Sequence, residues 1–157
     1  MSRFGGDRQT LADFQDQIWV RCPRCAAQAR VYRVEPGPVD AFAPRRLACL
    51  HCGALKSWTA RTIRYEPRDA VDPYFHCPLW LQTPCCGDVL WAYNRDHLDW
   101  LAAFVGADLR GRSADPQGGW VNRSLVSRLP GWMQAKHNRE AILRAIGQLR
   151  SLSDASQ

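Results

Sequence analysis

The chain has 157 residues, of which 46% are hydrophobic and 23% charged, and a formal net charge of +6. This size suits one domain or two small ones, and the composition excludes wholesale disorder, collagen-like repeats and simple coiled coils. No apolar run approaches the ~18 residues of a membrane span, and residues 1–10 lack the apolar stretch of a secretory signal. We therefore expect a cytoplasmic protein.

After an N-terminal extension over residues 1–17, the segment 18–66 carries two Cys-x2-Cys pairs, separated by 23 residues. Seven cysteines in a reducing compartment do not make a disulfide framework, and an odd number would leave one unpaired. Two residues between paired cysteines allow a tight turn in which both sulfurs face one ion at about 2.3 Å. We therefore expect one structural zinc ion bound by Cys22, Cys25, Cys49 and Cys52.

The sequence around the pairs is typical of a three-stranded zinc ribbon. Residues 28–34 form the first expected strand, 35–38 a turn, 45–49 the returning strand and 55–65 a third strand. A sheet this small has little core, so the ion should supply folding free energy on the order of 10 kcal/mol. His51 is a possible competing ligand, but the four thiolates already complete a shell and leave it facing solvent or a partner.

The segment 67–110 is expected to form a β-hairpin followed by a helix, so the fold class is α+β. The two strands, 74–81 and 88–93, flank a turn over 82–87. Asn94 is a good N-cap for a helix to residue 110 with apolar residues at spacings of three and four. We expect Trp80 and Trp91 to pack beneath this helix as core rather than to stack on bases.

Beyond the helix we expect a flexible loop over residues 111–121 and a C-terminal helical segment over 122–157. A short helix should run over 122–129 and a turn over 132–137, and Asn138 should cap the final helix. One face of that helix is apolar, with Ile142, Ala145, Ile146 and Leu149.

The other three cysteines, Cys77, Cys85 and Cys86, lie near His97 in the same segment, which makes a second metal site conceivable. There is no further Cys-x2-Cys pair, and successive side chains on extended backbone point apart, so adjacent cysteines seldom face one ion. We therefore expect these thiols to pack as small apolar groups and the chain to bind a single ion.

Charge is distributed unevenly along the chain. Residues 18–68 hold 10 Lys or Arg against 3 Asp or Glu, 69–108 one Arg against six Asp, and 109–157 a balance of +5. A basic ribbon predicts nucleic-acid binding that depends little on sequence. The candidate phosphate contacts are Arg21, Arg24, Arg30, Arg33, Arg45, Arg46, Arg61 and Arg64. Arg makes up 19 of the 21 basic residues, and a biased coding sequence is an alternative explanation for that preference.

Catalytic patterns are missing from the sequence. It contains no His-Glu-x-x-His, no Gly-x-Ser-x-Gly and no phosphate-binding Gly-x4-Gly-Lys-[Ser/Thr]. Cys77 and His97 could be drawn as a nucleophile and a base, but only composition supports that pairing. We therefore expect a protein that is not an enzyme.

Several stretches resemble bacterial proteins that contain a transcription factor IIB-type zinc ribbon. The resemblance covers residues 19–150 and rests on 19–25 (WVRCPRC), 47–53 (LACLHCG), 78–87 (PLWLQTPCCG) and the later residues 90–94, 97–98, 127–130, 132 and 138–139. It implies the ribbon fold, and transcription only by analogy of fold. Ala26 departs from the glycine common after the first pair, which could stiffen that turn.

Two functions follow as expectations. In the first, the ribbon binds nucleic acid through its arginines, and affinity falls steeply with salt. In the second, the ribbon is a rigid scaffold of a protein-binding adaptor or regulator, and the acidic middle segment or the Trp-containing C-terminal segment meets the partner. The charge of residues 18–68 favours the first.

Overall fold

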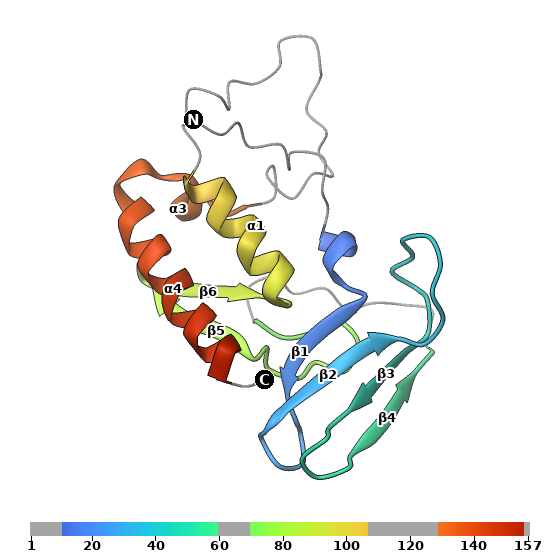
Figure 1. The fold of residues 1–157 in the computed structure, drawn as a ribbon. Helices are drawn as coiled ribbons and strands as arrows, with labels where there is room; N and C mark the ends of the chain where they lie inside the picture. The colour runs from blue at the N-terminus through green and yellow to red at the C-terminus, as the bar shows by residue number, and fades with distance from the viewer. Residues whose placement is uncertain (1–10, 60–69, 107–128, 156–157) are drawn as a thin grey trace.

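A computed structural model of the chain describes residues 11–59, 70–106 and 129–155. Two antiparallel sheets and two main helices form an α+β fold (Figure 1). The larger sheet has the strand order β1-β2-β3-β4 and the smaller one pairs β5 with β6. The larger sheet comprises β1 (Gln17–Arg21), β2 (Gln28–Arg33), β3 (Arg45–Ala48) and β4 (Leu55–Trp58).

The larger sheet has four strands rather than the predicted three. The additional strand is β1, which precedes the expected ribbon strands and pairs with β2. The central residues of β1, Ile18 to Val20, are all buried, so the alternation that marks a strand with one solvent face is absent. A short 3-10 helix, Leu11–Phe14, precedes β1 and packs its Leu11 and Phe14 into the core. The end of the predicted third strand, residues 60–65, lies outside the described residues.

Strand β1 joins the ribbon to the rest of the fold. Its outer edge exchanges backbone hydrogen bonds with two distant segments: the N–H of Trp19 donates to the carbonyl of Tyr93 (2.7 Å), and that of Arg21 donates to Pro78 (2.8 Å). The amide of Asn94 also donates to the carbonyls of Phe14 and Gln17. The sheet and the hairpin therefore share one continuous core.

The structure has the predicted hairpin, but its first strand lies at residues 81–85 rather than at the predicted 74–81, and its turn is shorter than expected. Strands β5 (Leu81–Cys85) and β6 (Asp88–Ala92) leave only Cys86 and Gly87 in the turn, with φ of 56° and 77°. Two successive positive φ values are typical of the tight turns whose twist matches that of a hairpin. Pro84 is tolerated inside β5 because this strand lies at an edge of the two-stranded sheet.

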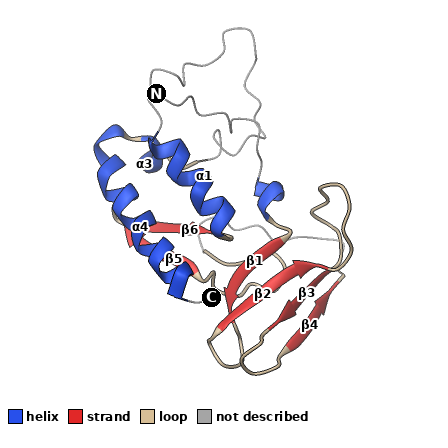
Figure 2. Ribbon diagram, in the orientation of Figure 1, coloured by secondary structure: helices blue, strands red, loops and turns tan. Residues whose placement is uncertain are grey.

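Helices α1 (Arg95–Gly106) and α4 (Arg139–Ala155) pack side by side on the hairpin, as Figures 1 and 2 show. Asn94 caps α1 as predicted, since its Oδ1 accepts the N–H of His97 at 2.9 Å. The predicted apolar face of α4 is buried, and Asp99 of α1 pairs with Arg150 of α4 at 2.9 Å.

Two short helical turns precede α4, namely α3 (Gly131–Gln134) and the 3-10 turn Lys136–Asn138. Asn138 uses its side-chain amide to bond the carbonyl of Trp132 at 2.9 Å. The predicted loop 111–121, nearly all of the predicted helix 122–129 and the end of the predicted helix 94–110 lie outside the described residues.

Candidate metal centre

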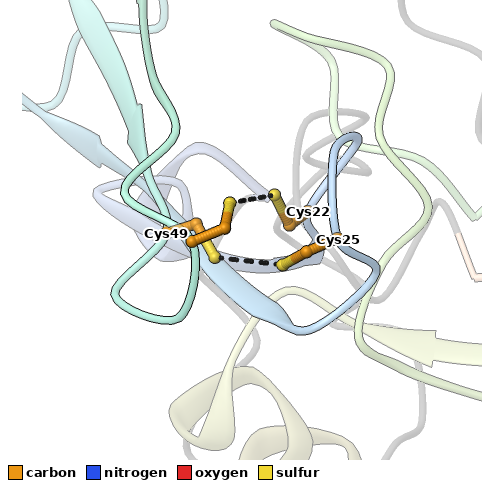
Figure 3. A group of neighbouring side chains, drawn as sticks. Cys22, Cys25 and Cys49 are labelled. Atoms are coloured by element: carbon orange, nitrogen blue, oxygen red, sulfur yellow. Dashed lines mark hydrogen bonds between the residues drawn. The ribbon is translucent and has the colours of Figure 1, made fainter.

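The four cysteines of the two Cys-x2-Cys pairs meet at the end of the larger sheet. Cys22 follows β1 and Cys49 follows β3, so the two turns come together where these strands end. The sulfur atoms of Cys22 and Cys52 lie 3.6 Å apart, as do those of Cys25 and Cys49, and all four lie within 4.8 Å of one another. Figure 3 shows the thiols from the two turns directed toward a common centre.

Both turns have the same backbone design. In the first knuckle (residues 22–27) the N–H of Cys22 donates to Ala27 and that of Ala26 to Cys22; in the second (residues 49–54) Cys49 donates to Ala54 and Gly53 to Cys49. The residue after each pair has a positive φ, 64° at Ala26 and 77° at Gly53. Glycine adopts this conformation freely, whereas alanine pays a steric cost for it. The departure at Ala26 therefore strains the turn.

The electrostatics of the cluster favour a bound cation. Burial raises the pKa of Cys22, but the backbone N–H groups of Cys25 and Arg24 and the neighbouring thiols lower it to about 6. At Cys25 the backbone N–H of Ala27 lowers the pKa, but burial and the other thiols raise it to about 12. One thiol ionises readily and further ionisation is opposed by the charge already present. A cation at the centre removes that opposition.

The geometry also fits a single tetrahedral ion. Four sulfurs bound at about 2.3 Å around one ion lie about 3.8 Å apart, close to the separations in the cluster. Cys22, Cys25, Cys49 and Cys52 could thus hold one metal ion. With four protein ligands such a site has no position left for water or substrate, so its chemistry is that of a structural cross-link.

The eight predicted phosphate contacts fall into different environments. Arg21, Arg24 and Arg30 are exposed, and Arg46 is half-buried. The strand register places Arg21, Arg30 and Arg46 on one face of the sheet, because Tyr32 of the same β2 face is opposite Arg46 and Trp19 is opposite Arg30. Arg61 and Arg64 lie outside the described residues.

Arg45 does not belong to the predicted binding surface, because its side chain is buried. Its side chain is 1% exposed, donates to the carbonyls of Gln15 and Asp40, and stacks on the ring of Tyr74 at 4.7 Å. A guanidinium with these partners inside the core cannot reach a phosphate from solvent. Sequence reasoning missed this role although Arg45 and Arg46 are adjacent in a strand, where consecutive side chains point to opposite faces.

Arg33 also turns away from solvent. Its side chain is 10% exposed and donates to the carbonyls of Gly37 and Pro38, so it fastens the loop that follows β2. It lies on the same face of the larger sheet as Arg45, its register partner in β3. Positive charge alone therefore did not identify which arginines are exposed. The alternation of side chains between the two faces of each strand separates them better.

The remaining cysteines do not gather around His97. The Nδ1 atom of His97 accepts the N–H of Tyr93 at 3.0 Å, and burial lowers the pKa of this imidazole to about 3. Burial raises the pKa of Cys77, which lies beside the ribbon, to about 11. Cys85 and Cys86 lie at the end of the β5–β6 hairpin. Within the described residues, the metal-ligating groups that cluster in threes or more are those of the four ribbon cysteines.

The chain matches no protein-family model, no curated protein and no solved structure. Its function must therefore be argued from its own residues. Among the described helices, none combines the length and the apolar composition needed to cross a membrane.

Proposed function

We propose that the four-cysteine cluster binds zinc and that the zinc ribbon so formed binds nucleic acid. Zinc is the ion that tetrahedral sites of four thiolates most often take in structural roles. The thiolates must stay reduced to hold it, which supports a cytoplasmic location. The closed shell supports a protein that is not an enzyme, as do the buried neutral imidazole of His97 and the raised pKa of Cys77.

The observation that carries nucleic-acid binding is the composition of one sheet face. We define the outer face as the side of the larger sheet that carries Arg21, Arg30 and Arg46. Its other strand residues are Gln17, Trp19, Gln28, Tyr32, Ala48, Leu55 and Ser57, so the strands place three arginines and no acidic residue there. Arg24, in the first knuckle, extends the exposed positive charge toward the metal centre.

Two aromatic side chains lie on the same face: Trp19, which is buried, and Tyr32, which is half-buried. The guanidinium of Arg30 lies 5.4 Å from the centroid of the Trp19 ring, which restricts its orientation. Tyr32 is the more accessible of the two aromatic side chains. Guanidinium groups next to an accessible aromatic side chain suit a phosphate backbone with unstacked bases, so single-stranded nucleic acid is the favoured ligand.

Salt dependence tests this proposal. Binding of the zinc-loaded protein to a fluorescent single-stranded oligonucleotide is measured by anisotropy over a range of salt concentrations. The double variant Arg21→Gln/Arg24→Gln should reduce the log–log slope by about 1.4, since each lost phosphate contact on a single strand contributes about 0.7. The control Lys136→Gln/Arg144→Gln removes two exposed charges outside the ribbon and should leave the slope unchanged. Equal effects of both pairs would refute a binding surface on the sheet.

One observation favours the adaptor as a second candidate. Leu50, inside the second knuckle, is 97% exposed, and Leu55 in β4 is 63% exposed. Large apolar side chains held out on a rigid metal-bound turn are typical of contacts with another protein. If Leu50→Ser abolishes co-purification of a partner that survives nuclease treatment, and the salt series detects no nucleic acid, the adaptor is the better description.

We also propose that the chain belongs with the bacterial proteins containing a transcription factor IIB-type ribbon. The paired knuckles and the antiparallel strands between them support this placement. The additional strand β1 and the hairpin attached to it would then be features of this branch that a minimal ribbon lacks.

A further inference from the structure

The two adjacent cysteines of the hairpin turn direct their sulfurs toward each other. The Sγ atoms of Cys85 and Cys86 lie 3.6 Å apart. On extended backbone they would point to opposite faces, which is the reason the sequence argued against a shared ligand. The left-handed conformation of Cys86, with φ of 56°, breaks that alternation. The tight turn therefore brings together what a strand would separate.

This pair matches the geometry of the metal centre in the same molecule. Its sulfur separation equals that of Cys22 and Cys52, and that of Cys25 and Cys49. In the metal centre such a pair spans one edge of a tetrahedron. Cys85 and Cys86 thus present one edge of a thiolate shell, on a different sheet from the ribbon. Among the described residues, no further metal-ligating group clusters with them.

The requirements of the turn do not explain a cysteine at position 86. Asparagine and glycine are the residues that such turns prefer, because they tolerate positive φ most easily. Cys86 is exposed, so packing in the core does not explain it either, while its neighbour Cys85 is buried at 8% exposure. An exposed thiol in a conformation unfavourable for cysteine, facing a second thiol, is best explained by chemistry that needs both sulfurs.

We propose that Cys85 and Cys86 form a second thiol site, a vicinal dithiol that binds a soft, thiophilic cation or metalloid through two adjacent sulfurs. The site is independent of the zinc ribbon and of nucleic-acid binding. It does not involve His97, whose Nδ1 is occupied by the N–H of Tyr93, nor Cys77, which lies beside the ribbon.

A trivalent arsenical is a suitable probe because it bonds stably to two neighbouring thiols. Phenylarsine oxide reacts with both S–H groups: two As–S bonds form, the As–O bond breaks, and the oxygen leaves as water with the two thiol protons. Arsenic stays trivalent, so no oxidant or reductant is required. The exposed Cys86 reacts first. Burial and the neighbouring Cys86 raise the pKa of Cys85 to about 11, so its proton is lost only as the second As–S bond forms.

The experiment measures the intact mass and zinc content of the zinc-loaded full chain after treatment with phenylarsine oxide. The wild type should gain one phenylarsenic group and keep its zinc. Cys85→Ser and Cys86→Asn should gain none, whereas the control Cys77→Ala should gain one. Cys86→Asn suits the turn, so its melting temperature should equal or exceed that of the wild type, which separates loss of the site from loss of the fold.

Three outcomes would overturn the proposal. The first is a wild type that gains no arsenic, which would mean that the thiols cannot act together. The second is a Cys86→Asn variant that still gains one group. The third is release of zinc in proportion to the arsenic bound, which would place the reaction at Cys22, Cys25, Cys49 and Cys52. Failure of nucleic-acid binding would leave this result unaffected.

Discussion

The ribbon and the hairpin–helix region bury very different amounts of apolar surface, although they share one core. Strands β2 and β3 contribute few fully buried apolar side chains, and every residue of β4 is exposed or half-buried. In contrast, the hairpin–helix region buries a large apolar set: Leu79, Leu81, Leu90, Leu98, Leu101, Phe104, Ile142, Ile146 and Leu149. The four clustered cysteines lie where the core is thin, so metal coordination would stabilise the ribbon, while packing stabilises the hairpin and the helices.

Strand β1 is where the two regions meet. It pairs with β2 on one edge and bonds to residues 78–80 and to Tyr93 on the other. Its residues Ile18 and Val20 are fully buried. We therefore expect β1 to remain partly ordered when the metal is removed, because its second edge does not depend on the knuckles.

The largest expected effect comes from breaking the metal centre. Cys49→Ser removes one of four ligands and should abolish stable metal binding, since binding contributes on the order of 10 kcal/mol to the folding of such sites. Metal content measured on the purified variant should fall to near zero, and the strands β2 to β4 should lose their structure. The control Cys77→Ala, a thiol outside the cluster, should retain one ion per chain. Full metal content in Cys49→Ser would contradict the assignment.

A smaller loss of stability is expected from substituting either of two adjacent arginines, Arg45 and Arg46, which lie on opposite faces of β3. Arg45→Met removes the donor to the carbonyl of Gln15, one of the two donors to the carbonyl of Asp40, and the stacking on Tyr74, so it should lower the free energy of unfolding by about 3 kcal/mol. Arg46→Met, on the outer face, should cost about 1 kcal/mol or less. Urea denaturation of the metal-loaded proteins measures both values. Similar losses in the two variants would show that Arg45 has no special structural role.

The hairpin–helix region should carry a pH dependence of its own. Burial lowers the pKa of His97 from 6.5 to about 3. Below pH 6.5 the unfolded chain binds a proton that the folded chain does not, so the free energy of unfolding falls by about 1.4 kcal/mol per pH unit as the pH decreases toward the folded value.

The variant His97→Gln isolates this contribution, because Gln does not titrate and its carbonyl can still accept the N–H of Tyr93. Between pH 7 and pH 5.5 the wild type should lose about 1.3 kcal/mol more than the variant. The difference between the two proteins cancels the loss of metal at low pH, which they share. Parallel pH profiles would show that His97 is protonated within the folded protein.

The smallest changes in stability are expected from substitutions at the residue that follows each cysteine pair in the two knuckles. Ala26→Gly relieves the positive φ of the first turn and should raise stability by up to about 1 kcal/mol. Gly53→Ala creates the same strain in the second turn and should lower stability by a similar amount. A Cβ at Gly53 would meet no atom within 4 Å, so the effect is purely conformational. Competition with a zinc chelator measures both variants, and changes of the same sign would contradict the equivalence of the turns.

Local patterns predicted the parts of this molecule that depend on local physics. The Cys-x2-Cys spacing identified the four cysteines that come together, and the cap at Asn94 and the apolar face of α4 followed from residues close in sequence. The predictions that were wrong concern residues whose environment is set by contacts with segments far away in the sequence. Strand β1 is covered on both sides by residues far along the chain, and Arg45 is buried by Tyr74 and by the carbonyls of Gln15 and Asp40.

The predicted length of the hairpin turn was wrong for a different reason. The segment 82–87 contains Pro84 and Gly87, and both residues are turn signals, so the turn was predicted too long. Only the pairing of Cys85 with Asp88 defines the two-residue turn, and that pairing also brings the sulfurs of Cys85 and Cys86 together. A residue type alone does not distinguish proline at a sheet edge from proline in a turn.

We propose that a metal ion holds the ribbon together, whereas packing holds the hairpin and the helices. Hydrogen exchange of the purified protein, with its metal content known and then after complete chelation, tests this claim most directly. We expect one zinc ion per chain, and loss of protection in β2, β3 and β4 on chelation while α1 and α4 stay protected. Protein purified without metal but with a fully protected ribbon would contradict it.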